Sequence, residues 1–401
     1  MAGQPVAIIG AGIAGLTAAL ALAAEGFPVT IFERARRIEE LGAGLQLSPN
    51  ATRLLARLDV LEEVRQRAVE PRSVIIRSAR DLGTLAEVPL DMARQRWGAP
   101  YLVLRRSDLQ AVLLKAAEQS SRITIATGAD VQNLSLASSG SGVNVEIRGS
   151  IPERHSFALA VAADGVWSSV RKRMGGPSSR FTGDVAYRAV LGSDNACQFR
   201  DTLLPSDRVA TFVLPGFHLV SYPLPDGAFN LVIILRGADL ARRWENVANI
   251  AELSAAARSI SPHLSSAITQ AEPWHAWPIH EVKSTQPWSR GNRIILIGDA
   301  AHAVAPHAAQ GAAMAIEDAV LLARVIGRSA AGENALALFE KLRRPRLIRV
   351  AMRGQFNHFA WQVGGPAALI RNFILRSRSG GSLAADFDWL YGYDIGKIAL
   401  N

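Results

Sequence analysis

The chain has 401 residues, enough for two domains with hydrophobic cores of their own. With 49% hydrophobic and 20% charged residues it has an ordinary globular composition, and no uncharged apolar stretch reaches the ~18 residues of a membrane-spanning helix. The net charge of +9 does not predict a nucleic-acid-binding protein, because the basic residues are scattered, without long runs and without basic–aromatic stripes.

The chain contains a single cysteine, Cys197. It therefore has no internal disulfide and no cysteine-based metal cluster, and we predict no metal site. No charged leader precedes the first apolar run, so we expect no export signal and a cytoplasmic protein.

The first predicted element is a buried strand over residues 6–9, followed by Gly10, Gly12 and Gly15. This G-x-G-x-x-G spacing allows a tight turn, a close backbone approach to a pyrophosphate and close packing of the next helix. We predict that this helix covers residues 13–25, with its N-terminal amides available to a phosphate.

A second strand is predicted over residues 29–32, and Glu33 stands at its end, 23 positions after Gly10. A carboxylate in this place can accept hydrogen bonds from the ribose hydroxyls of an adenosine half. The first 33 residues therefore predict a dinucleotide site.

The middle of the chain continues this α/β pattern. A helix is predicted over residues 107–119, and a hairpin over 131–136 and 143–147 with the Ser/Gly-rich segment 138–142 at its tip. A strand ending at Val161 leads into Asp164-Gly165, where Gly165 permits a tight turn. Ser168 and Arg171 are then available for a helix start and a phosphate, although a simple Asx-capped turn explains the same residues.

Strand patterns dominate residues 185–235, and Pro-, Gly- and Asp-rich turns separate them, which is typical of an antiparallel sheet. A helical stretch is predicted over 246–268. Another buried strand, 294–297, leads to Gly298 and Asp299, and helices are predicted over 312–326 and 334–359. We interpret Arg343, Arg344 and Arg346 as a solvated face of the last of these helices, and the Gly380-Gly381 region as irregular.

These elements predict an α/β fold: a Rossmann-like, three-layer dinucleotide-binding domain, an inserted, mostly antiparallel β-sheet domain, and C-terminal helices. The expected boundaries give a discontinuous dinucleotide domain of residues 1–71, 98–173 and 277–401. The inserted domain comprises residues 72–97 and 174–276.

Three ordered motifs now carry a resemblance: GAGIAG with Glu33, AADGVWSSVR at 162–171, and GDAAH followed by QGAAMAIEDA at 298–319. With LRRSDL around Arg106 and WLYGYD at 389–394, the chain resembles the single-component FAD-dependent aromatic hydroxylases. This group includes salicylate, 3-hydroxybenzoate and 6-hydroxynicotinate monooxygenases.

The resemblance implies tightly but non-covalently bound FAD, with NADH or NADPH as a transient electron donor. It implies that reduced flavin and O₂ form a C4a-hydroperoxide, which hydroxylates a small aromatic or heteroaromatic substrate that is phenolic or acidic. The cofactor-binding residues that it implies are Gly10, Gly12, Ala14, Gly15, Glu33, Arg34, Gln46, Arg106, Val131, Asp164, Asp299, Pro306, Gly311 and Ala312.

For catalysis we single out His218, Tyr222 and Gln310. His218 and Tyr222 point to one face of a predicted strand, where an imidazole could remove the proton of a phenolic substrate. The 6-hydroxynicotinate branch has a similar His and Tyr at this spacing, and Gln310 occupies the place of a glutamine that some members use near the substrate. A packing role for His307 is as acceptable as one over the flavin, and His302 is expected to be structural or close to FAD.

Two further functions stay open at this stage: FAD-dependent oxidation or epoxidation of a larger lipid or quinone precursor, and a flavin-binding redox regulator without turnover. A flavin-dependent halogenase is disfavoured, because the tryptophan run at 274–279 lacks the required order and no lysine precedes Lys115. The expected partners are the substrate, O₂ and NAD(P)H, in a monomer or a homodimer, without nucleic acid or an integral membrane segment.

Overall fold

The computed structural model describes residues 3–38, 44–138, 140–148, 153–199, 203, 205–240, 246–248, 253, 259–271, 273–283, 286–328 and 334–400. Within this part of the chain, no helix combines the length and the apolarity that crossing a bilayer requires.

The N-terminal motif is built into a six-stranded sheet. Its strand order is β18 (Ser289–Arg290), β19 (Ile294–Leu296), β12 (Leu159–Ala162), β1 (Val6–Ile9), β2 (Val29–Glu33) and β8 (Ile123–Thr127). All pairs are parallel except β18–β19. The central strands β1 and β12 are buried along their whole length, because helices and a second sheet cover the two faces.

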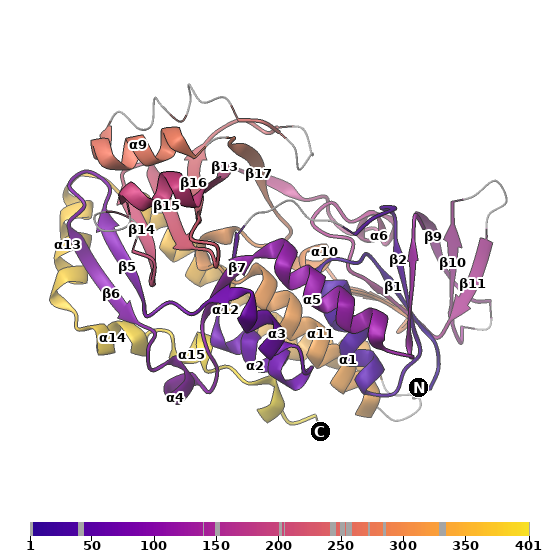
Figure 1. Ribbon diagram of the computed structural model, residues 1–401. Helices are drawn as coiled ribbons and strands as arrows, with labels where there is room; N and C mark the ends of the chain where they lie inside the picture. Colours follow the sequence, from indigo (N-terminus) through magenta and orange to yellow (C-terminus); the bar gives the residue numbers. More distant parts are fainter. Residues whose placement is uncertain are drawn as a thin grey trace.

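One face of this sheet is covered by α1 (Ile13–Ala24), α5 (Arg106–Gln119) and α11 (Gly311–Arg328), which lie together in Figure 1. A three-stranded sheet of β9 (Val131–Leu136), β10 (Val143–Ile147) and β11 (Glu153–Phe157) packs on the other. Phe157 of β11 meets Phe32 of β2 edge to face, with ring centroids 5.8 Å apart. The predicted three-layer arrangement and the predicted 131–147 hairpin are confirmed.

A separate seven-stranded sheet has the order β17 (His275–Glu281), β13 (Arg180–Leu191), β16 (Phe229–Arg236), β15 (Phe217–Pro223), β14 (Arg208–Leu214), β5 (Ser73–Ser78) and β6 (Thr84–Pro89). It is antiparallel apart from the β14–β5 pair, as predicted for the inserted sheet. Helix α9 (Pro262–Gln270) packs on its outer side through Leu264 and Ile268, which leaves the inner face for the site described below. β17 crosses the expected limit at 276/277, and the division into domains stays a proposal.

Short elements connect these layers. A third sheet has the order β3 (Gly44–Leu47), β7 (Leu102–Arg105) and β4 (Ala68–Val69). The short helices are α2 (Pro49–Arg57), α3 (Leu61–Gln66), α4 (Ala93–Trp97), α6 (Ser169–Arg173), α7 (Ser193–Ala196) and α10 (Asp299–His302), with 3₁₀ turns η1 (Cys197–Phe199), η3 (Pro306–Ala308) and η4 (Ile395–Lys397).

The C-terminal region differs from the expectation. The long helix α12 (Ala335–Gln362) is confirmed, but the predicted irregular segment is helical in α13 (Gly365–Ser377), α14 (Gly380–Ala385) and α15 (Asp388–Tyr391). Gly380 and Gly381 begin a helix because the Ser379 side chain caps it, accepting a hydrogen bond from the Ser382 amide. Pattern reasoning took these glycines for a break.

The helix predicted over 246–268 is confirmed only for its end, where α9 begins at Pro262. Val247 forms a β-bridge with His275 instead, and most of the remaining residues of this stretch lie outside the described part of the chain.

Candidate functional site

A cavity of about 1260 Å³ is lined by residues of both large sheets and of the C-terminal helices. It exceeds the ~300–1,000 Å³ that is common for one drug-sized ligand. Fifteen of the seventeen predicted site residues line it; the other two are Gly15 and Gln310.

The glycines of the first motif are required by close contacts. Gly10 has a φ of +100°, and a Cβ there would lie 2.7 Å from the carbonyl oxygen of Ala163. A Cβ on Gly15 would collide with the carbonyl oxygen of Gly10, so this residue packs α1 against β1 and does not face the cavity. Nothing lies within 4 Å of a Cβ on Gly12, where bare backbone borders the cavity. This is the arrangement that a pyrophosphate needs.

Two carboxylates border this end of the cavity. Glu33 accepts hydrogen bonds from the amides of Ala11 (2.8 Å) and Ala35 (2.9 Å), which fix its direction and leave lone pairs for a ribose. Asp164 caps α6 through Oδ2, which accepts from the Ser169 amide at 2.8 Å, while its Oδ1 is buried without a partner among the described residues. The capping explanation for Asp164 is therefore correct for Oδ2, and Oδ1 is a second acceptor that a ligand can use.

Arg171 departs from the expectation. Its guanidinium is buried and donates to the carbonyl oxygens of Pro177, Ala300 and Val166, so it ties the second motif to the third and does not line the cavity. The predicted phosphate contact is wrong, because these carbonyls already take its donors. Ser168 does hold the helix start, since its hydroxyl accepts from the Arg171 amide at 2.9 Å.

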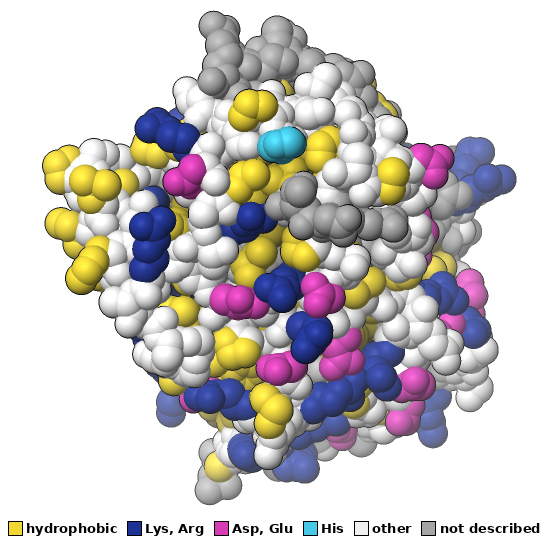
Figure 2. All heavy atoms as spheres, turned by 60° about the vertical axis from the view of Figure 1, so that its left-hand side comes forward, with side chains coloured by type: hydrophobic (Ala, Val, Ile, Leu, Met, Phe, Trp, Pro, Cys, Tyr) yellow, Lys and Arg dark blue, Asp and Glu magenta, His cyan; other side chains and the backbone are white. Residues whose placement is uncertain are grey.

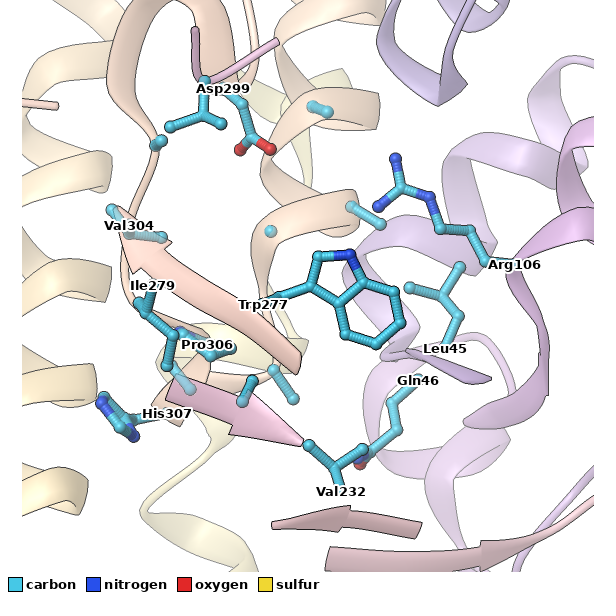
Figure 3. Close-up of a pocket in the computed structure, with 18 of the residues that line it drawn as sticks. Leu45, Gln46, Arg106, Val232, Trp277, Ile279, Asp299, Val304, Pro306 and His307 are labelled. Carbon is cyan, nitrogen blue, oxygen red and sulfur yellow. The ribbon is translucent and has the colours of Figure 1, made fainter. Parts of the chain in front are cut away.

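The third motif lies across the cavity from Arg106 and Gln46. In Figure 3, Asp299 projects from the start of α10, and Val304, Pro306 and His307 follow along one wall, opposite Arg106, Leu45 and Gln46. Gly311 and Ala312, at the start of the 18-residue helix α11, also border the cavity. A helix N-terminus there favours negative charge, which a reduced flavin carries.

These observations fit FAD. A glycine turn without side chains, a carboxylate for a ribose, a buried acceptor without a partner at Asp164 and a helix N-terminus border one continuous space, which is what a dinucleotide needs.

The inner face of the seven-stranded sheet forms the opposite wall. Alternate residues of each strand point into the cavity: Ala186 and Arg188 of β13; His218, Val220 and Tyr222 of β15; Thr211 of β14; Val232 and Ile234 of β16; and Trp277 and Ile279 of β17. His218 pairs with Ile234 and Val220 with Val232 across the sheet. His218 and Tyr222 therefore lie on the same wall, with Val220 between them.

His218 is almost completely buried, and its Nδ1 has no partner within the described structure. Burial, with the nearby His307 and His358, lowers the pKa of His218 to about 3. The ring is therefore neutral near pH 7, with an acceptor in the cavity wall.

Two more imidazoles continue from His218. The His218 and His307 ring centroids are 5.6 Å apart, His307 and His358 stack at 4.3 Å, and His358 Nε2 lies 3.2 Å from Asp184 Oδ2. Potential ligand atoms of Asp184, His307 and His358 lie within 4.8 Å of one another, a group that the sequence did not predict. The His307 and His358 rings are only 21° from parallel, so their nitrogen lone pairs do not point at one centre, which does not favour a metal ion.

Tyr222 is buried, and burial raises its pKa although the Arg188 charge opposes this. Tyr101 lies near it and donates to Gln46 Oε1 at 2.7 Å. The phenol groups therefore stay protonated and can donate hydrogen bonds.

Sequence reasoning missed Arg188 and Trp277. Trp277 extends from β17 into the middle of the cavity (Figure 3), and the Arg188 guanidinium carbon lies 5.2 Å from its ring centroid. The available signal was an arginine inside the apolar strand pattern VAYRAV, two positions after Ala186 and on the same face.

Gln310 does not reach the cavity. Its amide donates to Ser48 Oγ at 2.9 Å and accepts from Asn50 at 3.1 Å, which joins the start of α11 to α2. The side-chain amide of Gln310 is used for this connection. We therefore no longer propose that Gln310 contacts the substrate, and propose instead that it positions α11.

The solvated arginine face predicted on α12 is wrong for two of its three members. Arg343 and Arg346 are buried, and Arg343 bonds Glu317 at 2.8 Å and Asp318 at 2.7 Å, while Arg346 bonds Glu317 at 2.9 Å. Burial favours the neutral acids, but the charges of His302 and Arg343 prevail and hold the pKa of Asp318 at about 2. His302 Nε2 donates to Asp318 Oδ2 at 2.6 Å, an arrangement that favours the expected structural role of His302. We call Glu317, Asp318, Arg343 and Arg346 the ion cluster.

Comparisons with known proteins agree with this site. Residues 4–353 match the protein family described as "FAD binding domain". The chain is 31% identical over 396 residues to 3-hydroxybenzoate 6-hydroxylase of Polaromonas naphthalenivorans, covering 98% of this chain and 97% of the relative. It is 30% identical over 411 residues to 6-hydroxynicotinate 3-monooxygenase of Bordetella bronchiseptica, covering 98% and 97%.

Solved structures share the fold. Klebsiella pneumoniae HpxO complexed with FAD and uric acid superimposes with a TM-score of 0.82 at 24% identity, covering 96% of this chain and 95% of that one. A salicylate hydroxylase substrate complex gives a TM-score of 0.81 at 22% identity, with 98% and 97% covered. The chain therefore belongs to the FAD-dependent aromatic hydroxylases, with FAD as its cofactor, as the sequence resemblance implied.

Proposed function

We propose that this enzyme uses NAD(P)H and O₂ to hydroxylate a small phenolic aromatic or heteroaromatic acid. Bound FAD supplies the oxygen-transfer chemistry once it is reduced. The protein holds the substrate ring beside the flavin, excludes water and accepts the phenolic proton.

One observation carries the proposal. The wall with His218, Tyr222 and Arg188 borders the same cavity as the residues that fit FAD, so a small ring bound on this wall lies next to the cofactor.

His218 is the proposed proton acceptor. Its neutral ring and buried, unpartnered nitrogen suit a hydrogen bond from a substrate hydroxyl, and the electron pair left on the phenolate oxygen activates the ring. A low pKa makes the free histidine a weak base, but an anion bound beside it favours the protonated form. His218 holds this proton while the substrate ring reacts, and the His307 ring lies beside it, with the two ring centroids 5.6 Å apart.

Arg188 is the proposed contact for the carboxylate. Among the described residues that face the cavity from this sheet it is the one with a positive charge, and β16 alone separates its strand from that of His218. Strands lie ~4.8 Å apart, so the two Cα positions are on the order of 10 Å apart across the sheet. A hydroxylated aromatic acid is long enough for its opposite ends to meet the two side chains.

The remaining wall is apolar. Val220, Val232 and the Trp277 ring border the same space, where they can pack against an aromatic ring and keep water away. Such a site with a few convergent polar groups is typical of small-molecule binding.

NAD(P)H is proposed as a transient donor, because the chain has one G-x-G-x-x-G turn and the cavity residues at that turn fit FAD. Its use also supports our proposed cytoplasmic location. A monomer or a homodimer stays the proposed assembly.

The test is NAD(P)H oxidation by purified, FAD-loaded enzyme with a panel of mono- and dihydroxybenzoates, hydroxynicotinates and their methyl esters, with product analysis. We expect one acid to stimulate oxidation and to gain one oxygen atom, and its methyl ester to be poorer. Turnover of a lipid or quinone precursor alone, or stimulation by no compound, would overturn the proposal.

A further inference from the structure

Exposed hydrophobic side chains concentrate on one part of the surface. Among the described residues, eleven large hydrophobic side chains are exposed, and eight of them belong to α12 and α13: Ile348, Met352, Phe356, Phe359, Leu369, Ile370, Phe373 and Ile374. We call these eight the apolar surface. Single exposed hydrophobic residues are normal, but a cluster of this kind marks an interaction site.

The spacing turns the eight residues into two helical stripes. On α12 they follow one another after four, four and three positions, and on α13 they stand at 369, 370, 373 and 374, so each group lies on one helix face. α13 has no buried residue at all. Figure 2 shows hydrophobic side chains standing out beside Lys and Arg side chains on this part of the molecule. α13 therefore has the form of an amphipathic helix that lies on a surface.

The charged residues within the apolar stretches of α12 and α13 are all basic. Residues 348–378 contain five arginines and no Asp or Glu: Arg349, Arg353, Arg371, Arg376 and Arg378. Asp386 pairs with Arg378, whereas the guanidinium groups of Arg349 and Arg353 lie over the rings of Trp389 and Phe387. An anionic partner is attracted here.

The apolar surface continues into the cavity. Phe356, Phe359, Ile370 and Ile374 are exposed and also line the cavity, so whatever covers the apolar surface also covers this side of its opening.

We propose that the apolar surface docks on the headgroup region of a bilayer that contains anionic lipids. Apolar side chains flanked by arginines on a surface helix are the combination that inserts shallowly into such a bilayer. A second copy of the chain fits less well, because a twofold interface brings the same patch against itself, and the arginines of the two copies would then lie close to one another. Docking would place this side of the cavity opening at the membrane surface.

The test is flotation of the FAD-loaded enzyme with vesicles of phosphatidylcholine alone or of phosphatidylcholine with phosphatidylglycerol. We expect binding to the anionic vesicles, weakened by added salt. The double variant Leu369→Ser/Phe373→Ser should reduce the bound fraction about tenfold or more, because two apolar side chains that would insert into the bilayer are lost. Neither residue lines the cavity, so FAD content and turnover without vesicles should not change.

The matched control is Met92→Ser, which removes an exposed hydrophobic side chain outside the apolar surface and should bind vesicles as the parent does. Equal binding to both vesicle types, or no vesicle binding, overturns the proposal. Light scattering that shows a dimer which Leu369→Ser/Phe373→Ser dissociates, without vesicle binding, would assign the surface to a second copy instead.

Discussion

The molecule contains two buried polar regions that are built in opposite ways. In the ion cluster, Glu317, Asp318, Arg343 and Arg346 satisfy one another at 2.7–2.9 Å. On the cavity wall, the His218 ring is just as deeply buried but has an unpartnered nitrogen.

The difference separates structural from functional polarity. A buried charge with complete pairing costs much free energy when one partner is removed, while a buried acceptor without a partner already carries its desolvation penalty. The ion cluster therefore fixes α11, whose N-terminus borders the FAD site, to α12, and the cavity wall keeps its hydrogen-bonding capacity for a ligand.

The largest expected effect is on the ion cluster. Arg343→Met should lower the free energy of unfolding by about 3–5 kcal/mol, because Glu317 and Asp318 stay buried without this cation. Denaturant unfolding measures it. The control Arg65→Met removes an exposed i,i+3 pair with Glu62 and should cost less than about 1 kcal/mol. Equal losses in the two variants would show that the ion cluster is not the stronger structural element.

Next comes the cavity wall. His218→Asn should reduce the hydroxylation rate roughly 100-fold, the lower end for loss of a proton acceptor, with little loss of stability and normal FAD content. Single-turnover hydroxylation, with the acid that the substrate panel identifies, measures this rate. His263→Asn, which changes an exposed histidine on α9, is the control. An unchanged rate and pH profile in His218→Asn would remove His218 from the mechanism.

A smaller effect is expected at Arg188. Arg188→Gln should raise KM for an anionic substrate roughly 10- to 100-fold, the equivalent of one charge-assisted hydrogen bond, and leave KM for the neutral methyl ester unchanged. Arg180→Gln alters an exposed arginine on the same strand, paired with Glu281, and should behave as the parent does. An equal rise in KM for the acid and the ester would mean that Arg188 shapes the cavity wall but does not bind the substrate carboxylate.

The last effect is on pH dependence. Burial lowers the pKa of His218 and of His307 from 6.5 to about 3, so the unfolded chain binds protons between these values that the folded chain does not. Their contribution to stability is complete above pH 6.5 and is lost as the pH falls toward 3, by up to about 1.4 kcal/mol per pH unit for each histidine. Unfolding measured at several pH values should show a shallower slope for His218→Asn than for the parent, and identical slopes would contradict the low pKa.

Much of the fold could be predicted because its signals are local. The strand before Gly10, the glycine spacing and Glu33 lie within 33 residues, and each follows from what a neighbouring residue permits. His218 and Tyr222 were predicted from alternation along one strand, which shows which side chains share a face, and from the resemblance to the 6-hydroxynicotinate branch.

What was missed depends on elements distant in the sequence. Arg343 looks like any arginine of a basic helix until Glu317 and Asp318 of α11 pack against it. Gln310 seemed directed at the substrate, but Ser48 and Asn50, more than 250 residues away, take its amide. Gly380 and Gly381 were predicted to interrupt the helices, but the cap formed by Ser379 makes them the start of a helix.

The sequence by itself determined that this chain holds FAD. The turns that bind a dinucleotide are short segments, and their geometry depends on glycines and helix ends within the segment. The tertiary structure alone decided which charges are buried and paired and which side chains share the wall opposite the cofactor site. Burial and pairing depend on what a distant segment brings to within a few ångströms, and no local pattern carries that information.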